Sequence, residues 1–251
     1  MSSSEWIYGR NPVLEVLRSG HRNVMEIQLA SGVELSGSLA EIVSLAEQRQ
    51  LPVLQLPRTD LDRKHQNNQG ILARVSEYSY SSLDEIVDKA AEAVEDPFLL
   101  LLDVVQDPQN LGTLLRTAEA VGVHGVIIPT KRTALVTPAV VSASSGASEH
   151  VRIAQYNIAQ AIRALKEQGV WVAGLAASEG ARPLQDVDLS GPIALVVGHE
   201  GSGMRRLVQE SCDFLVRIPM RGAVASLNAA VAGSVVLYRV WEQRKFVGSG
   251  S

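Results

Sequence analysis

The chain has 251 residues, of which 46% are hydrophobic and 20% charged, as expected for a soluble globular protein of one or two domains. Its single cysteine, Cys212, excludes an intrachain disulfide, and the first residues lack the basic and apolar segments of a secretion signal, so we expect a cytoplasmic protein. The formal net charge of −4 argues against a uniformly basic protein. Most of the acidity lies in one short stretch, because residues 81–96 hold 6 Asp/Glu against 1 Lys/Arg. Residues 97–251, by contrast, hold 14 Lys/Arg against 12 Asp/Glu, a small excess of positive charge.

Residues 1–78 are expected to form a small α/β domain. Asn11 is a suitable N-cap, and Pro12 occupies the first position of a short amphipathic helix that reaches Leu17. Short apolar runs then predict strands, and a periodic segment between the first two predicts a helix. These elements are strands over residues 24–30, 52–56 and 71–75 and a helix over residues 38–48.

Residues 79–96 are expected to be an acidic connector. A helix over residues 82–93 fits the pattern of apolar positions, and its like charges indicate a solvated face. No internal repeat marks this or any other part of the chain.

From residue 97 to residue 251 short apolar runs alternate with helical patterns. This alternation predicts a second α/β domain with a parallel sheet that helices cover on both faces. The expected strands are residues 98–103, 124–128, 151–154, 170–175, 193–197 and 214–218. The expected helices are residues 110–121, 157–168, 204–211 and 226–244, with a weaker helix near residues 138–145.

Three polar clusters follow expected strands directly. They are Asp107–Gly112 with Arg116, Gly198–Gly203, and Ile218–Asn228. Because ligands of parallel sheets bind outside the carboxyl ends of the strands, we expect these clusters to form one site.

Each cluster also has a purely structural interpretation. Asn110 could cap its helix, Arg116 could pair with Glu119, and Ser226 and Asn228 could begin the last helix. The glycine-rich cluster has the spacing G-x-x-G-x-G and comes late in the sheet, which does not match a dinucleotide-binding fingerprint. The five histidines show no metal-ligand spacing, so no metal site is expected.

Together the three clusters resemble the SpoU-type RNA 2'-O-ribose methyltransferases, the TrmH family of the SPOUT superfamily. The motifs that carry this resemblance are Leu102-Asp103, Asp107-Pro108-Gln109-Asn110-Leu111-Gly112, Leu115-Arg116-Thr117-Ala118, Gly198-His199-Glu200-Gly201-Ser202-Gly203-Met204, Ile218-Pro219-Met220 and Ser226-Leu227-Asn228. Ile7-Tyr8-Gly9 and Gln69-Gly70-Ile71-Leu72-Ala73 extend it into the N-terminal domain, and it is greatest to the bacterial 23S rRNA guanosine 2'-O-methyltransferases.

The resemblance implies a trefoil knot in the second domain, an L30e/L7Ae-like RNA-binding fold in the first, a homodimer, and S-adenosylmethionine as the cofactor. By the same resemblance, the catalytic positions are Asn110, Arg116, Glu200, Ser226 and Asn228. The cofactor-binding positions are Gly198, Gly203, Ile218, Met220 and Leu227.

The expected reaction is methylation of a ribose 2'-hydroxyl in RNA. Arg116 would favour the alkoxide as an electrostatic stabiliser, or act as an unusual base. The expected target is a guanosine of 23S rRNA. A tRNA nucleotide is the first alternative, a non-catalytic RNA-binding protein is the second, and a nucleotide-dependent oxidoreductase is the third. The sequence departs from the family at three positions. Asn68 stands where His is more usual, His199 where Asn or Ala is more usual, and Ala225 where Ser is more usual.

Overall fold

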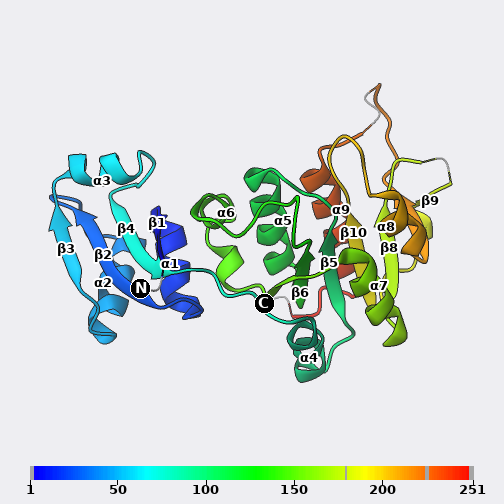
Figure 1. The fold of residues 1–251 in the computed structure, drawn as a ribbon, viewed down its shortest axis with the longest axis horizontal. Coiled ribbons are helices and arrows are strands. Elements are labelled where there is room, and N and C mark those ends of the chain that lie inside the picture. Colours follow the sequence, from blue (N-terminus) through cyan, green and yellow to red (C-terminus); the bar gives the residue numbers. More distant parts are fainter. Residues whose placement is uncertain (1–2, 179, 224–225, 249–251) are drawn as a thin grey trace. The chain divides into compact units, whose positions relative to one another are not determined.

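The structure is a computed structural model that describes residues 3–178, 180–223 and 226–248. The chain divides into two compact units, which Figure 1 shows as ribbons. The N-terminal unit comprises residues 1–79 and 135–150, and the C-terminal unit comprises residues 80–134 and 151–251. None of the helices in the described ranges has the length and apolar character needed to cross a membrane.

The N-terminal unit is built on a four-stranded sheet with the order β1-β4-β2-β3. Strand β4 lies antiparallel to both β1 and β2, whereas β2 and β3 are parallel. The strands are β1 (Ser4–Tyr8), β2 (Val24–Ala30), β3 (Val53–Leu56) and β4 (Ile71–Ser76). The three strands expected from the sequence are confirmed, and β1 is an additional edge strand.

Three helices follow the strands of this unit, namely α1 (Arg10–Ser19), α2 (Ser38–Gln48) and α3 (Arg58–Lys64). The first two were expected, and they bury apolar faces. The N-cap predicted at Asn11 is wrong, because α1 begins at Arg10 after Gly9, so that Asn11 and Pro12 lie within its first turn. Helix α3 was not expected, because its only buried side chain is Leu61 and one apolar position gives no helical period. Leu61 packs with Ala30 and Leu72 beside Trp6 and Tyr8.

The segment 135–150 belongs physically to the N-terminal unit, although it lies between two strands of the second sheet in the sequence. It contains α6 (Pro138–Ala143) and a 3-10 turn (Ala147–Glu149). Glu149 and Arg22 form an ion pair at 3.1 Å in which neither side chain is exposed, and Arg22 also contacts Glu5 at 2.7 Å. Burial raises the pKa of Glu149 above its usual value. The boundaries expected at residues 78 and 96 stay predictions.

The C-terminal unit contains a seven-stranded sheet with the order β7-β6-β5-β10-β8-β11-β9. Every pairing in it is parallel, as the alternating pattern predicted. The strands are β5 (Phe98–Leu102), β6 (Gly125–Ile128), β7 (Ile153–Gln155), β8 (Trp171–Leu175), β9 (Arg182–Pro183), β10 (Ile193–Val197) and β11 (Phe214–Arg217). The two-residue β9 was not expected.

Helices lie on both sides of this sheet (Figure 1). On one side α4 (Leu83–Ala93), α7 (Ile158–Glu167) and α8 (Arg206–Ser211) pack on alternate side chains of the central strands. On the other side lie α5 (Pro108–Ala120) and α9 (Ala229–Gln243). The predicted α/β class with helices on both faces is confirmed; the trefoil knot is consistent with this strand order and stays an expectation.

Gly233 allows α9 to approach α5 and the sheet closely. A Cβ at this position would lie 2.6 Å from Leu114 Cδ2 and 3.2 Å from Val197 Cγ2. The two helices are also joined by a hydrogen bond of 2.8 Å between the hydroxyls of Thr117 and Ser234. This packing fixes the start of α9 beside the start of α5.

Cys212 packs against the core on the side of the sheet that α4, α7 and α8 cover, as a small apolar side chain would. Burial raises the pKa of its thiol to about 12, so the thiol stays neutral near pH 7.

Candidate active site

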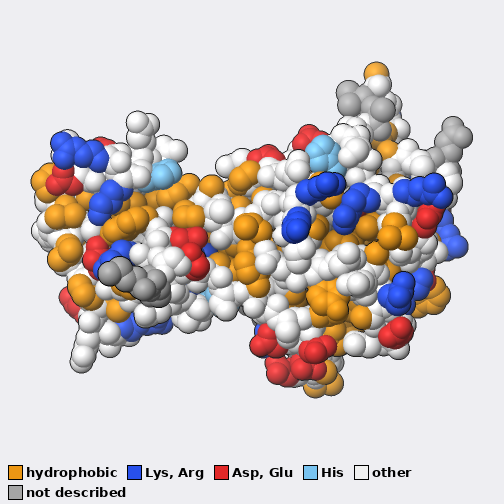
Figure 2. Space-filling view, in the orientation of Figure 1, with side chains coloured by type: hydrophobic (Ala, Val, Ile, Leu, Met, Phe, Trp, Pro, Cys, Tyr) orange, Lys and Arg blue, Asp and Glu red, His pale blue; other side chains and the backbone are white. Residues whose placement is uncertain are grey.

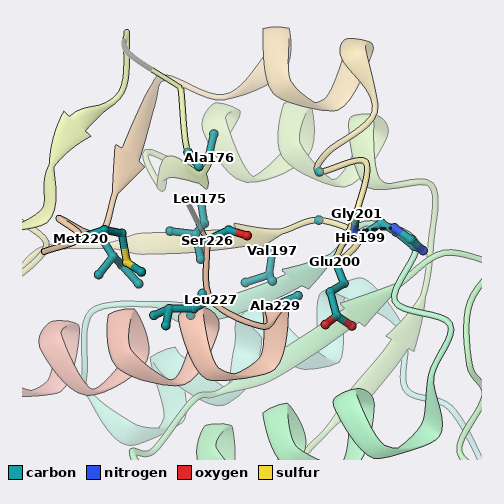
Figure 3. Close-up of a pocket in the computed structure, with 15 residues that line it drawn as sticks. Leu175, Ala176, Val197, His199, Glu200, Gly201, Met220, Ser226, Leu227 and Ala229 are labelled. Atoms are coloured by element: carbon teal, nitrogen blue, oxygen red, sulfur yellow. Dashed lines mark hydrogen bonds between the residues drawn. The ribbon is translucent and has the colours of Figure 1, made fainter. Parts of the chain in front are cut away.

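Chain segments that leave the carboxyl ends of β8, β10 and β11 surround a cavity of about 220 Å³ in the C-terminal unit. The start of α9 closes the same cavity (Figure 3). Parallel sheets place their ligand sites at this edge. The lining residues are Leu175, Ala176, Ala177, Val197, Gly198, His199, Glu200, Gly201, Gly203, Ile218, Met220, Ser226, Leu227, Ala229 and Ala232.

The loop after β10 folds so tightly on itself that two of its positions require glycine. A Cβ on Gly198 would lie 2.3 Å from the backbone nitrogen of Met204, and Gly203 has a φ of 69°. His199 and Gly203 exchange two backbone hydrogen bonds of 3.0 Å. The His199 ring accepts a hydrogen bond at Nδ1 from the Gly201 nitrogen at 3.0 Å, which assigns the ring proton of a neutral His199 to Nε2.

A buried carboxylate joins this loop to the end of β5. Asp103 is fully buried and accepts hydrogen bonds of 2.7 Å from the backbone nitrogen and from Nε of Arg205. Because the charge of Asp103 is paired, its burial does not leave an isolated anion in the core. This ion pair holds the loops after β5 and β10 next to each other.

Asn110, Glu200 and Asn228 form a hydrogen-bonded cluster that joins all three predicted polar segments. The Glu200 carboxylate accepts hydrogen bonds from Asn110 Nδ2 at 3.2 Å and from Asn228 Nδ2 at 3.1 Å. Asn228 Nδ2 also donates to Asn110 Oδ1 at 3.0 Å. Glu200 points from its loop toward the start of α9 in Figure 3. The carboxylate therefore orients both amides.

Asn228 has a second role as the N-cap of α9. Its Oδ1 accepts from the backbone nitrogens of Ala230 at 2.8 Å and Val231 at 3.2 Å. Helix α9 therefore begins three residues later than the sequence suggested, and Ser226 and Leu227 precede it in the cavity wall. The departure noted at Ala225 lies outside the described residues.

The structure brings nine of the ten predicted site residues to this cavity or its hydrogen-bonded cluster. Those expected at the cofactor, Gly198, Gly203, Ile218, Met220 and Leu227, all line the cavity. Of the positions expected in catalysis, Glu200 and Ser226 line it, and Asn110 and Asn228 bond to Glu200. Arg116 is exposed on α5 and is not part of the lining. It lies six residues after Asn110, about 9 Å along the helix.

Sequence reasoning missed the contribution of β8. Leu175, Ala176 and Ala177 line the cavity, because β8 lies between β10 and β11 in the sheet. These small and apolar residues carry no chemical signal of their own. Their place at the carboxyl end of an expected strand could have marked them.

The cavity combines apolar side chains with exposed backbone polar groups. Such a surface suits a flat heterocycle, which packs against aliphatic groups and receives hydrogen bonds at its edge. Among the residues that the structure describes, no three His, Cys, Asp or Glu side chains gather as a metal site requires.

The sequence matches the SpoU rRNA Methylase family over residues 97–238. This chain belongs to the SpoU/TrmH family of RNA methyltransferases. Residues 6–81 match a second family, described as RNA 2'-O ribose methyltransferase substrate binding. The two matches together cover most of the chain.

Individual RNA methyltransferases resemble the chain over nearly its whole length. A putative TrmH family tRNA/rRNA methyltransferase of Bacillus subtilis is 40% identical, with 97% of this chain and 98% of the relative covered. The SpoU methyltransferase AviRb of Streptomyces viridochromogenes, crystallised with AdoMet, has a TM-score of 0.78 at 25% identity, covering 97% of this chain and 91% of that one. An AdoMet-bound rRNA methyltransferase of Sinorhizobium meliloti has a TM-score of 0.76 at 25% identity, with coverage of 98% and 88%.

Proposed function

We propose that this SpoU/TrmH protein transfers a methyl group from S-adenosylmethionine to a ribose 2'-hydroxyl in RNA. The observation that carries the proposal is the junction of a cavity suited to the cofactor with the cluster of Asn110, Glu200 and Asn228. Both lie at one edge of one sheet.

The residues of the cavity fit S-adenosylmethionine. Its adenine would pack against the aliphatic side chains of Leu175, Ile218 and Leu227, and backbone groups near Gly198 would bond to the ring edge. A side chain at Gly198 has no room, so the backbone itself forms this part of the wall. Two similar solved structures, a SpoU methyltransferase and an rRNA methyltransferase, hold AdoMet, which supports the same assignment. When bound, the cofactor supplies an electrophilic methyl group.

The protein would align the acceptor and favour its deprotonation. Glu200 fixes the orientation of the Asn110 and Asn228 amides, whose remaining hydrogen-bonding capacity can hold a ribose hydroxyl. Ser226 in the cavity wall can add another hydrogen bond. Arg116 would stabilise the developing alkoxide electrostatically, since guanidinium groups rarely lose their proton.

We further propose that the target is a guanosine of 23S rRNA, presented in an unpaired loop. Side chains cannot read the narrow major groove of an RNA duplex, so recognition would need a splayed nucleotide. The substrate-binding match over residues 6–81 supports a role of the N-terminal unit in holding this RNA. A tRNA nucleotide is the second candidate, because curated relatives are described as tRNA/rRNA methyltransferases.

A homodimer is proposed on the basis of an apolar stripe along α9 and the residues before it. Leu227, Val231, Val235 and Tyr238 recur every three or four residues and are 36–48% exposed. A single chain leaves these side chains uncovered, and a second copy could bury them. The stripe starts at the cavity, since Leu227 belongs to both.

The test is methyl transfer from radiolabelled S-adenosylmethionine to unmodified transcripts of 23S rRNA and of tRNA. Nucleoside analysis of the product should give 2'-O-methylguanosine from the 23S transcript. A 2'-O-methylated nucleoside from tRNA alone would replace the rRNA assignment by the second candidate. A base-methylated product would contradict the proposed reaction.

A further inference from the structure

A short basic loop follows β6 in the C-terminal unit and has no role in the site described above. Residues 129–134 form this loop, and Lys131 and Arg132 are exposed at its centre. Within the described part of the chain, neither side chain has a carboxylate partner or a hydrogen bond. Two adjacent cations are thus left available to an external anion.

Hydrogen bonds hold the basic loop against the segment that leads into the candidate site. The backbone carbonyl of Val105 accepts from the nitrogen of Ala134 at 2.8 Å and from Oγ1 of Thr133 at 3.0 Å. Val105 lies between buried Asp103 and Asp107, the N-cap of α5. The basic loop is therefore anchored to the same loop that positions α5 and its catalytic candidates.

The sheet order sets the distance between the basic loop and the cavity. Strand β5 lies between β6 and β10, so the loops after β6 and β10 are two strand spacings apart, or about 10 Å. A few nucleotides of an extended RNA strand cover such a distance. Figure 2 shows lysine and arginine side chains gathered on one face of the C-terminal unit, over the region of α5, β10 and α8.

The backbone of this region is strained on both sides of the anchoring contact. Arg132 has a φ of 60° and Val104 a φ of 66°, a left-handed conformation that residues other than glycine, asparagine and aspartate rarely adopt. Strain of this kind concentrates at functional sites. Because glycine would fit position 132 without strain, the arginine side chain is the feature that needs an explanation.

We propose that Lys131 and Arg132 bind backbone phosphates of the nucleotides next to the target ribose. This inference rests on the proposed function, and it gives the C-terminal unit its own grip on RNA in addition to that of the N-terminal unit. Phosphate contacts position an RNA without reading its sequence. The loop would therefore set the register of the strand at the cavity, whatever RNA carries the target.

The experiment compares full-length Lys131→Ala/Arg132→Ala with wild type and with Arg163→Ala/Lys245→Ala. The control removes the same two charges from exposed positions, one in the middle of α7 and one just after α9. Filter binding to an unmodified 23S rRNA transcript is measured between 50 and 200 mM KCl, a range over which lost phosphate contacts are readily seen.

The loop variant should show a weaker salt dependence than wild type, with the slope of log K against log salt reduced by about 1.4, or 0.7 for each lost contact to a single strand. Its KM for RNA should rise, while kcat at saturating RNA and the affinity for S-adenosylmethionine stay unchanged. The control variant should follow wild type, and Lys131→Arg/Arg132→Lys should restore the slope.

A second variant, Arg132→Gly, separates binding from folding. It removes the cation and relieves the left-handed backbone, so it should weaken RNA binding without lowering the midpoint of thermal unfolding. If wild type methylates RNA but the loop variant keeps its slope, or loses no more than the control, the loop assignment is wrong and the proposed function stands. If wild type neither binds nor methylates RNA, both proposals are wrong.

Discussion

Glu200 receives hydrogen bonds from amides at the starts of α5 and α9, two elements that are far apart in the sequence. Because the carboxylate accepts a hydrogen bond from each amide, it fixes the directions in which the amide oxygen atoms and the remaining N–H groups point. The Glu200 side chain thereby joins polar groups at the starts of α5 and α9 into one continuous polar surface. Its proposed function is to position these amides.

Arg116→Ala should reduce methyl transfer strongly while leaving the affinity for S-adenosylmethionine nearly unchanged. The reason is that Arg116 lies on α5 outside the cavity lining, yet would supply the positive charge that favours the alkoxide. Single-turnover rates with the RNA substrate and calorimetry with the cofactor measure the two effects separately.

The matched change Arg116→Lys keeps the charge and should retain more activity than Arg116→Ala. If Arg116→Ala keeps more than about a tenth of the wild-type rate, it costs less than ~1.4 kcal/mol of transition-state stabilisation. Arg116 would then be an ordinary solvated helix residue.

The composition of the site could be predicted from the sequence because its chemistry lies in motifs. Gly198, Ile218 and Leu227 stand in loops that follow recognisable strands, and the structure places all three in the cavity wall. Ala176 and Ala177 could not be found this way, because alanine has no chemistry that distinguishes a cavity wall from a core. Their place depends on the sheet order, which puts β8 between β10 and β11.

The contact between α5 and α9 controls the geometry of the cluster, because Asn110 lies in the first turn of α5 and Asn228 is the N-cap of α9. Gly233→Val should destabilise the fold by about 1–3 kcal/mol through overpacking against Leu114 and Val197, and should lower methyl transfer as the start of α9 moves. Thermal unfolding and activity assays measure both effects.

Gly191→Val is the control for this prediction, since a Cβ at Gly191 meets nothing within 4 Å. It should leave stability and activity close to those of wild type. Equal stability of the two variants would mean that α9 does not depend on this close approach.

Helices and strands with a clear apolar period were predicted correctly, and those without one were not. Helix α3 buries only Leu61, and β1 is a short edge strand that exposes Ser4. The sequence also did not predict that residues 135–150 associate with the N-terminal unit. This association includes the buried pair of Arg22 and Glu149, which are 127 positions apart and leave no local pattern.

The molecule as a whole is expected to be a dimer of 27.0 kDa chains. The uncovered stripe on α9 should lie at a two-fold interface larger than about 1,000 Å². Val235→Asp should shift the protein toward monomers, because it places a charge in that apolar interface at a position that is 42% exposed in one chain. Light scattering with size-exclusion chromatography measures the mass.

Arg163→Asp is a suitable control for the dimer, because it places an aspartate at an exposed position on α7, away from the stripe. A wild-type protein that is monomeric and active at micromolar concentration would contradict the dimer. The apolar stripe would then be a feature of the single chain.

Cofactor binding tests the central claim most directly, and calorimetry of the full-length protein with S-adenosylmethionine and with NAD measures it. The account predicts saturable binding of one S-adenosylmethionine per chain and no heat with NAD. Ala176→Phe, which fills the cavity, should abolish this binding, whereas Ala120→Phe on the exposed face of α5 should not. A folded wild-type protein that binds no S-adenosylmethionine, or that binds NAD in its place, would contradict the account.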